Sequence, residues 1–361
     1  MKKTKLYEIH KSLGANMTNF AGYEMPISYG SIMKEHNCVR NSVGVFDVSH
    51  MGEFLVEGGN AENFLQYCCS NDVKKLFIGR AQYNYFANLN GGIIDDLIVY
   101  KLEENKFLLV VNASNIQKDW EHLNFLNKKF NVELKNISNN ISLLSIQGPN
   151  STKLLNKISD FNFGALNNYM NCVTNIAGIK KVIVGSTGYT GAVGYEIYCD
   201  NKNVKQIWNV LLNKGKEFNI LPIGLAARDS LRIEMGYCLY GNEIDENTSP
   251  IQAGLSWITK TETNFYGSNR INEDIENGCK YMIIGIKSEE RMIPRNGDVI
   301  LNSDKNEIGR ITSGTFSPTL KIPIGIGFIF KDNLNYDDEI FVNNKRKTFK
   351  AKISSLPFIR S

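Results

Sequence analysis

The sequence predicts an α+β protein with antiparallel sheets and a separate, barrel-like β domain at its C-terminal end. Up to about residue 255, strand-like and helix-like segments follow one another in a strand, hairpin and helix order that favours antiparallel sheets. Beyond about residue 255 the pattern changes to short strands, which is typical of a barrel-like domain. The length of 361 residues exceeds what one compact core fills, so two or three domains are expected.

Helices are predicted where apolar residues recur at helical spacing. In the segment 116–130, for example, Ile116, Trp120 and Leu123 fall on one face of a helix. Asparagine and glycine at the ends of such segments serve as start and stop signals. The predicted helices cover 31–43, a short stretch capped by Asn60, 116–130, 203–218 and 224–235.

Strands are predicted where apolar and polar residues alternate, or where β-branched residues lie between turns. Residues 53–57 alternate in this way and end at the turn Gly58-Gly59. In the first part of the chain the predicted strands are 45–48, 53–57, 83–87, 93–100, 107–111, 141–146, 180–184 and 195–198. In the C-terminal part they are 281–287, 309–315, 324–330, 339–342 and 347–353.

The composition is that of a soluble globular protein, with 42% hydrophobic and 22% charged residues. The net charge of +4 is mild, and basic residues are interspersed with acidic ones and form no long block, so neither nucleic acid nor an anionic membrane is expected as a partner. The seven cysteines are scattered and the four histidines lack metal-motif spacing, which predicts reduced thiols, a cytoplasmic location and no metal. We expect neither an export signal nor a membrane-spanning helix, because no long apolar run occurs.

The most informative segment is 91–100, in which the carboxylates of Asp95 and Asp96 follow a glycine turn and lie within a strand-like apolar run. Side chains alternate along a strand, so the two carboxylates point to opposite faces and one of them can face a pocket. A carboxylate in a partly dry pocket suits a ligand that carries N–H groups. The alternative is a simple hairpin turn with two solvated aspartates.

Several planar or hydrogen-bonding side chains fall at predicted turns and strand ends, namely Tyr83, Asp95, Asn112, Tyr189, Glu196, Arg228 and Tyr237. Tyrosines offer flat faces for a conjugated ring, carboxylates accept paired N–H groups, and an arginine binds a carboxylate through two parallel hydrogen bonds. This set suits a pterin with a glutamate tail. Taken alone, each tyrosine is better explained as a core residue with a satisfied hydroxyl, and the alternative for Arg228 is a helix salt bridge with Asp229 or Glu234.

Taken together, motifs along nearly the whole chain resemble the glycine cleavage T-protein family, the aminomethyltransferases of the glycine cleavage system. These motifs, which are weak singly and specific jointly, are Phe20 to Pro26, Phe46 to Gly52, Gly91 to Asp96, Gln147-Gly148-Pro149, Thr187 to Gly191, Gly194 to Ile197, Gly224 to Asp229, Leu239-Tyr240-Gly241 and Thr312 to Pro318.

The resemblance implies a fold and a reaction. The fold is a three-domain cloverleaf around a central opening, with a folate-binding domain of residues 1–52, 138–172 and 199–255, a ferredoxin-like domain of residues 53–137 and 173–198, and a C-terminal barrel of residues 256–361. In the reaction, an aminomethyl group on the lipoyl arm of the H-protein passes to tetrahydrofolate, which gives methylenetetrahydrofolate, ammonia and dihydrolipoyl H-protein. The resemblance implies no metal and no redox cofactor.

The resemblance also implies roles for individual residues. Asp95 resembles the catalytic carboxylate near the attacking folate nitrogen, while Asp96 is the weaker candidate. Glu196 and Tyr189 would bind the edge and the face of the pterin, and Arg228 lies near the folate. The pocket would be completed by Met51, Tyr83, Asn112 and Tyr237, with Arg360 near the glutamate tail or the partner protein.

One departure from the family and two alternative functions follow from the same motifs. The loop from Gly191 to Gly194 carries Ala192-Val193 where relatives usually have an acidic residue, so folate affinity here could differ. The first alternative is a folate-dependent demethylase acting on a small methylated substrate without a carrier protein. The second is a non-catalytic folate-binding protein, a group marked by a Lys-Gly-Cys motif where this chain has Tyr237-Cys238-Leu239.

Overall fold

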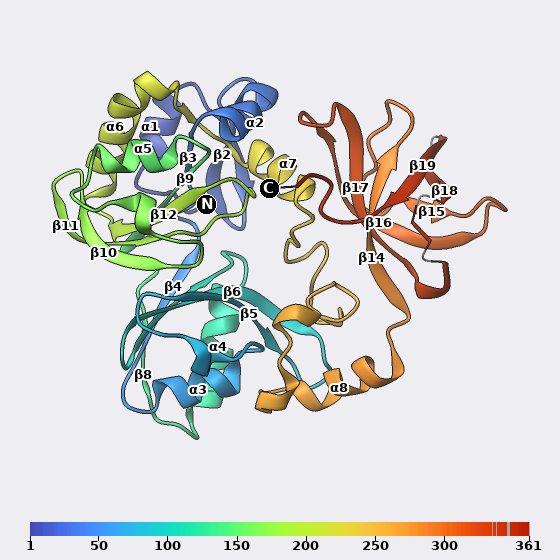
Figure 1. The fold of residues 1–361 in the computed structure, drawn as a ribbon, viewed down its shortest axis with the longest axis horizontal. Coiled ribbons are helices and arrows are strands. Elements are labelled where there is room, and N and C mark those ends of the chain that lie inside the picture. Colours follow the sequence, from blue (N-terminus) through green and yellow to red (C-terminus); the bar gives the residue numbers. More distant parts are fainter. Residues whose placement is uncertain (334, 337, 345–346, 361) are drawn as a thin grey trace. The chain divides into compact units, whose positions relative to one another are not determined.

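The computed structural model describes residues 1–333, 335–336, 338–344 and 347–360, which form two compact units (Figure 1). Unit 1 contains Met1–Gln66, Asp72–Asn84 and Leu97–Arg228, and unit 2 contains Tyr67–Asn71, Tyr85–Asp96 and Asp229–Ser361. The division falls within strands β5 (Ala81–Ala87) and β6 (Ile93–Glu103) and within helix α7 (Leu225–Glu234).

Unit 1 holds a six-stranded sheet in the order β10-β11-β12-β9-β3-β13. Its strands are β3 (Gly44–Asp47), β9 (Ile141–Gln147), β10 (Asn171–Ile176), β11 (Ile179–Gly185), β12 (Gly194–Asp200) and β13 (Leu221–Pro222). Helices α1 (Tyr7–Ser12), α5 (Ser151–Asn156) and α6 (Val204–Lys214) pack beside it (Figure 1). The core includes Val45, Ile146, Leu154 and Trp208, all fully buried, so burial of these apolar side chains stabilises the sheet against its helices.

A second sheet has five strands in the order β5-β6-β7-β4-β8. Its strands β4 (Gly52–Glu57), β7 (Lys106–Val111) and β8 (Glu133–Asn136) are accompanied by helices α3 (Ala61–Cys68) and α4 (Ile116–Asn127). Phe54 of β4 packs on Trp120 of α4, with ring centroids 5.2 Å apart, so one face of this sheet is covered by α4. Next to these sheets are the hairpin of β1 (Asn16–Phe20) and β2 (Tyr23–Ser28) and helix α2 (Ile32–Asn41), which Ser31 caps.

The C-terminal part of unit 2 is a closed barrel in the order β14-β17-β16-β15-β18-β19. Its strands are β14 (Tyr281–Ser288), β15 (Val299–Leu301), β16 (Glu307–Ser317), β17 (Ile322–Phe330), β18 (Glu339–Asn343) and β19 (Thr348–Ser354). Inward-facing side chains such as Ile284, Ile300 and Ile329 fill its core. Helix α8 (Ser268–Asn277) precedes the barrel in the sequence.

The α+β class and the C-terminal barrel predicted from the sequence are confirmed. The elements that the prediction missed are α1, α5 and α8 and the strands β1, β2, β8, β10, β13 and β15. Strand β15 has only three residues, and the polar residues of β10 hide its strand pattern. The helix predicted over 203–218 ends as α6 at Lys214 and continues as a 3-10 turn over Gly215–Phe218. The three-domain division and its cloverleaf arrangement stay predictions.

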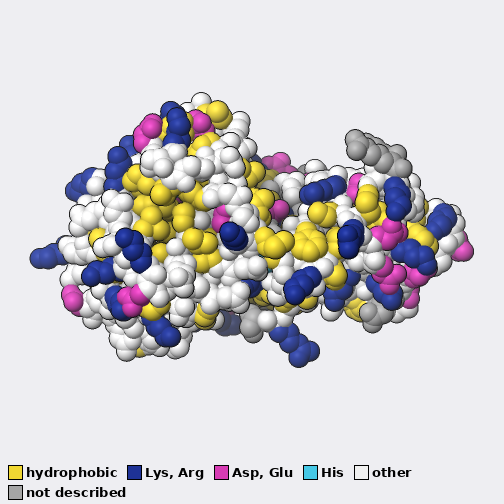
Figure 2. Space-filling model, turned by 90° about the horizontal axis from the view of Figure 1, so that it is seen from above, with side chains coloured by type: hydrophobic (Ala, Val, Ile, Leu, Met, Phe, Trp, Pro, Cys, Tyr) yellow, Lys and Arg dark blue, Asp and Glu magenta, His cyan; other side chains and the backbone are white. Residues whose placement is uncertain are grey.

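Charged side chains are dispersed over the surface. On the face that Figure 2 shows, lysines and arginines lie scattered among acidic and uncharged side chains, as their mixed order in the sequence predicts. The described part of the chain contains no helix long and apolar enough to cross a membrane.

Candidate functional site

A buried glutamine shapes the glycine-rich loop between β11 and β12. Gln147 donates from Nε2 to the carbonyl of Thr187 at 3.1 Å and accepts at Oε1 from the hydroxyl of Thr190 at 2.8 Å. A Cβ on Gly188 or Gly194 would lie only 2.2 or 2.4 Å from atoms of this amide. Both glycines are therefore required by the close approach of the Gln147 side chain.

Glu196, a predicted folate residue on β12, is held by hydroxyl groups within unit 1. Thr187 Oγ1 donates to Glu196 Oε2 at 2.6 Å, and the hydroxyl of Tyr198 lies 3.5 Å from the same oxygen. The hydroxyl oxygen of Tyr100, on β6, lies 2.6 Å from Thr187 Oγ1 and 3.0 Å from the hydroxyl oxygen of Tyr198. Burial, together with the charge of Glu196, raises the pKa of both tyrosines, so their hydroxyl groups remain neutral. Tyr198 reaches the carboxylate directly, whereas Tyr100 supports it through Thr187 and Tyr198.

Tyr189 and Arg228, two further predicted folate residues, are in contact. The guanidinium carbon of Arg228 lies 4.6 Å from the centroid of the Tyr189 ring. Helix α7, which carries Arg228, begins where the backbone N–H of Gly224 donates to Glu35 Oε2 at 2.8 Å. A Cβ on Gly224 would lie 2.3 Å from the carbonyl oxygen of Ile27, so the helix start is packed directly on another backbone segment.

His50 lies in the segment between β3 and β4, next to the predicted folate residue Met51, which is half-buried. The imidazole is 2% exposed and packs edge-on against Phe20 at 5.4 Å. Burial and then the positive charge of Arg228 lower its pKa to about 4, against an opposing effect of Asp47. His50 is therefore neutral near pH 7.

The structure places six of the nine predicted site residues in unit 1. Besides the four described above, Tyr83 lies half-buried on β5, and Asn112 lies half-buried directly after β7. The other three, Asp95, Tyr237 and Arg360, belong to unit 2.

The Asp95-Asp96 doublet lies near the start of β6, as predicted. Asp95 is fully buried, whereas Asp96 is half-buried, so the alternative of two solvated aspartates is wrong for Asp95. Because side chains alternate along a strand, Asp95 shares its face of β6 with the buried Leu97 and Asp96 shares the other face with Ile98. Asp96 also adds, after burial and the charge of Glu243, to the raised pKa of the Cys238 thiol.

The turn before the doublet is held by the segment around residue 245. The side-chain amide of Asn88 donates to the carbonyl of Glu246 at 2.8 Å, and the N–H of Ile93 donates to the carbonyl of Asp245 at 2.9 Å. A Cβ on Gly92 would lie 1.8 Å from that Glu246 oxygen. Glycine at position 92 thus permits the backbone contact that fixes the start of β6.

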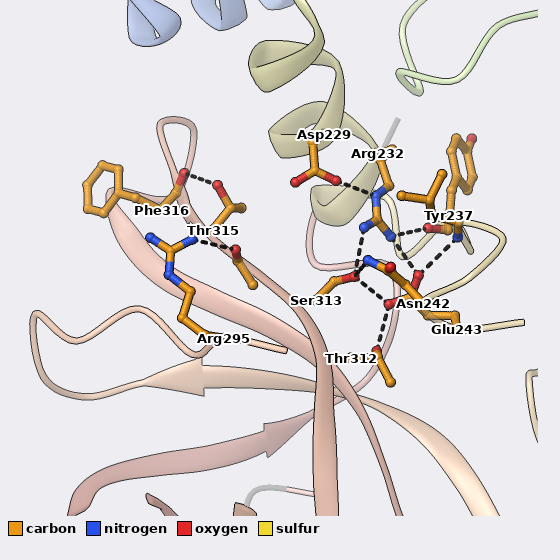
Figure 3. A network of polar contacts seen from close by, with 12 residues as sticks. Asp229, Arg232, Tyr237, Asn242, Glu243, Arg295, Thr312, Ser313, Thr315 and Phe316 are labelled. Carbon is orange, nitrogen blue, oxygen red and sulfur yellow. Dashed lines mark hydrogen bonds and ion pairs between the residues drawn. The ribbon is translucent and has the colours of Figure 1, made fainter. Parts of the chain in front are cut away.

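A buried arginine organises the surroundings of Tyr237 (Figure 3). Arg232, which is 1% exposed, donates to the carbonyl of Tyr237 at 3.0 Å and pairs with Asp229 and Glu243, both at 2.8 Å. It also donates to Ser313 Oγ of β16 at 2.7 Å. The backbone of Tyr237 is therefore fixed, while its side chain is 36% exposed. Arg360, near the chain end, is exposed.

Sequence reasoning missed the residues that support Glu196. Thr187 and Tyr100 come from other segments, and no local pattern links them to Glu196. Tyr198 could have been found, because it lies two positions after Glu196 and so shares its face of β12. In the part of the chain that the structure describes, no group of three or more histidine, cysteine or acidic residues is arranged for a metal.

Comparison with known families identifies the class of protein. Residues 6–263 match the family described as GCVT N-terminal domain. Residues 282–359 match the family described as glycine cleavage T-protein C-terminal barrel domain, and this range contains most of the closed barrel.

Individual relatives cover the whole chain. It is 45% identical over 360 residues to the aminomethyltransferase of Flavobacterium psychrophilum, with 100% of both chains covered. It is 46% identical to that of Bacteroides fragilis, with 99% of each covered. The crystal structure of glycine cleavage system aminomethyltransferase T from Bartonella henselae matches with a TM-score of 0.93 at 33% identity, covering 99% of this chain and 98% of that one. The chain belongs to the glycine cleavage T-protein family, and the resemblance seen in the sequence is confirmed.

Proposed function

We propose that this chain transfers the aminomethyl carbon of a lipoylated H-protein to tetrahydrofolate. The chain is an aminomethyltransferase of the glycine cleavage system, because it is 45–46% identical over its full length to proteins of that name and matches both domains of the family. In the proposed reaction the carbon loses its bonds to the lipoyl sulfur and to the amine, and gains two bonds to folate nitrogens. Methylenetetrahydrofolate, ammonia and the dihydrolipoyl H-protein result. The carbon keeps its oxidation level, so the transfer needs no redox cofactor.

The observation that carries the folate proposal is the arrangement around Glu196. Its carboxylate is oriented by Thr187 and Tyr198 and remains partly exposed, which suits the adjacent N–H groups of a pterin ring. The flat Tyr189 ring with Arg228 above it supplies a planar surface and a cation for a ligand that has a conjugated ring and a carboxylate tail. We include Met51, Tyr83, Asn112, Tyr237 and Arg360 in the proposed folate site as the family resemblance implies.

The proposed catalytic group is a carboxylate of the Asp95-Asp96 doublet. The family resemblance points to Asp95, near the folate nitrogen that attacks the methylene carbon. Asp95 is fully buried, whereas Asp96 is half-buried and lies on the face of β6 that also carries Ile98 and Tyr100. A carboxylate beside the nitrogen would orient it and stabilise positive charge as the new bond forms.

Two substitutions test this assignment. Replacing the catalytic aspartate with asparagine should lower turnover by at least about ten-fold, because the lost interaction acts mainly in the transition state. The affinity for folate should remain nearly unchanged. Asp95→Asn and Asp96→Asn are compared with Asp160→Asn, an exposed control. The assay is the steady-state release of ammonia from aminomethylated H-protein. Wild-type turnover in both variants would remove the doublet from the mechanism.

The H-protein requirement separates the proposal from its alternatives. If ammonia release with tetrahydrofolate depends on the lipoylated carrier, a demethylase of a free methylated substrate is ruled out. A non-catalytic folate-binding protein would show no turnover at all. Cys238 is buried and its pKa is raised, so this thiol is a poor match to a reactive cysteine motif. We also propose a cytoplasmic location, since the seven cysteines are free thiols throughout the described residues.

A further inference from the structure

Glu53 of β4 is a buried acid whose carboxyl group is not satisfied by the protein. Its side chain is 1% exposed, and neither carboxyl oxygen has a hydrogen-bond partner among the described residues. Its backbone is fully engaged, because its N–H donates to Ser138 Oγ at 2.9 Å and its carbonyl accepts from the N–H of Ile137 at 3.0 Å. A polar group buried without a partner is costly, and native structures keep few of them.

The strand register shows which way Glu53 points. The next residue, Phe54, packs on Trp120, so Glu53 lies on the sheet face away from helix α4. Glu53 is paired with Val110 of β7, and Val110 is paired with Ile98 of β6. The carboxyl group is therefore set among apolar side chains on this second face of the sheet, and Ile98 remains partly exposed.

The same face leads to the Glu196 cluster. Tyr100 lies two positions after Ile98 on β6, so it shares this face, and its hydroxyl contacts Tyr198 at 3.0 Å. The charge of an ionised Glu53 raises the pKa of Tyr198 and of Tyr23, which places the carboxyl group within electrostatic range of both. All of these residues belong to unit 1, together with Glu196.

Glu53 and Glu196 differ in the chemistry that they offer. The Glu53 carboxyl group is buried without a hydrogen-bond partner among the described residues, and burial raises its pKa well above the usual value, so the neutral, protonated form is favoured. A carboxylate accepts hydrogen bonds only, whereas a protonated carboxyl group donates one and accepts another. The Glu196 carboxylate therefore suits a ligand edge that carries two neighbouring hydrogen-bond donors. The protonated carboxyl group of Glu53 suits a ligand edge that carries one acceptor next to one donor.

We propose that Glu53 recognises the reduced state of the folate by pairing with the C4 carbonyl and the N5–H of its pterin ring. This inference rests on the proposed folate site. In tetrahydrofolate these two groups are an adjacent acceptor and donor. In dihydrofolate N5 carries no hydrogen and is an acceptor, so one of the two hydrogen bonds is lost and an acceptor faces an acceptor. Glu53 is then a specificity-determining residue that favours the tetrahydro over the dihydro form.

The test compares the dissociation constants of dihydrofolate and tetrahydrofolate, measured anaerobically by calorimetry on the full chain. We expect Glu53→Leu to weaken tetrahydrofolate binding about ten-fold or more and to reduce the preference for the tetrahydro form by a similar factor. Glu53→Gln keeps one donor and one acceptor, and it should retain most of the preference. Glu57→Leu serves as control, because Glu57 lies on the same strand but pairs with Lys106 and Lys135 near the surface.

A purely structural role predicts a different outcome. In the structural alternative, a bridging water accepts and donates the hydrogen bonds of the Glu53 carboxyl group. Glu53→Leu would then change the melting temperature but leave the ratio of the two dissociation constants at its wild-type value. That result would overturn the proposal. Loss of the preference in Glu53→Gln as complete as in Glu53→Leu would overturn it as well. If wild-type protein binds neither folate, the proposed function itself fails, and this result is distinct from both.

An infrared measurement keeps the proposal testable should Glu53→Leu not fold. Wild-type protein should show the carbonyl band of a protonated carboxyl group that disappears in Glu53→Gln and shifts when tetrahydrobiopterin is added, since that compound carries the reduced ring without the glutamate tail. A band that is absent from wild-type protein, or that does not respond to the reduced pterin, would contradict a direct contact.

Discussion

The guanidinium group of Arg228 lies over the ring of Tyr189, with 4.6 Å between the guanidinium carbon and the ring centroid. This contact joins the start of helix α7 to the glycine-rich loop of unit 1. It leaves a planar cation at a position where the same charge also lowers the pKa of His50. Arg228 thus contacts the loop that carries Tyr189 and acts electrostatically on His50, and both effects can be tested.

Arg228→Ala should weaken tetrahydrofolate binding by more than about 1 kcal/mol if the charge pairs with the ligand, and calorimetry measures this. The same variant should raise the pKa of His50, because one of the two effects that lower it is removed. A pH titration followed by NMR of the imidazole reports that shift. Arg310→Ala, which removes an exposed arginine of the barrel, is the control. Unchanged folate affinity would show that the charge of Arg228 does not pair with the ligand.

His50 makes stability depend on pH in a defined direction. Its pKa of about 4 in the folded protein is below the 6.5 of an unperturbed histidine, so between these values the unfolded chain binds a proton that the folded chain does not. Stability from this group is present above about pH 6.5 and is lost as the pH falls towards 4, by about 3 kcal/mol in total. Urea unfolding across this range should show a smaller loss in His50→Gln. An identical pH dependence in both proteins would contradict the prediction.

Gly92→Ala should destabilise the protein by about 1–3 kcal/mol, because the added carbon would lie 1.8 Å from the carbonyl oxygen of Glu246. Gly59→Ala is the matched control, since a Cβ at that turn position meets no atom within 4 Å among the described residues. Thermal unfolding measures both. If the two variants melt alike, the backbone contact next to the aspartate doublet is not tight in solution.

Arg232→Met should cost about 3–5 kcal/mol, because it leaves the fully buried Glu243 without its cationic partner. Arg270→Met removes an exposed arginine that pairs with Asp274, and it should cost less than about 1 kcal/mol. Denaturant unfolding compares them. The double variant Arg232→Met with Glu243→Gln should recover part of the loss. Without such recovery, the cost would come from packing and not from the stranded charge.

Local patterns carried much of the prediction. Alternation over 53–57 predicted β4, and helical spacing from Ile116 predicted α4, because both periods follow directly from backbone geometry. Strands without a pattern were missed, since three residues such as Val299–Leu301 cannot display a period. Ser31 was predicted to open a helix and does cap α2.

By itself, the sequence determined the family, the α+β class with its C-terminal barrel, and the types of side chain available for binding a pterin. Only the tertiary structure decided that Asp95 is buried while Asp96 is not, that Thr187 and Tyr198 hold one oxygen of Glu196, and that Glu53 lacks a partner among the described residues. The physical reason is that composition and periodicity are properties of neighbouring residues. Burial and hydrogen bonding depend instead on which distant segments pack together, and that packing sets both proton affinity and the orientation of a functional group.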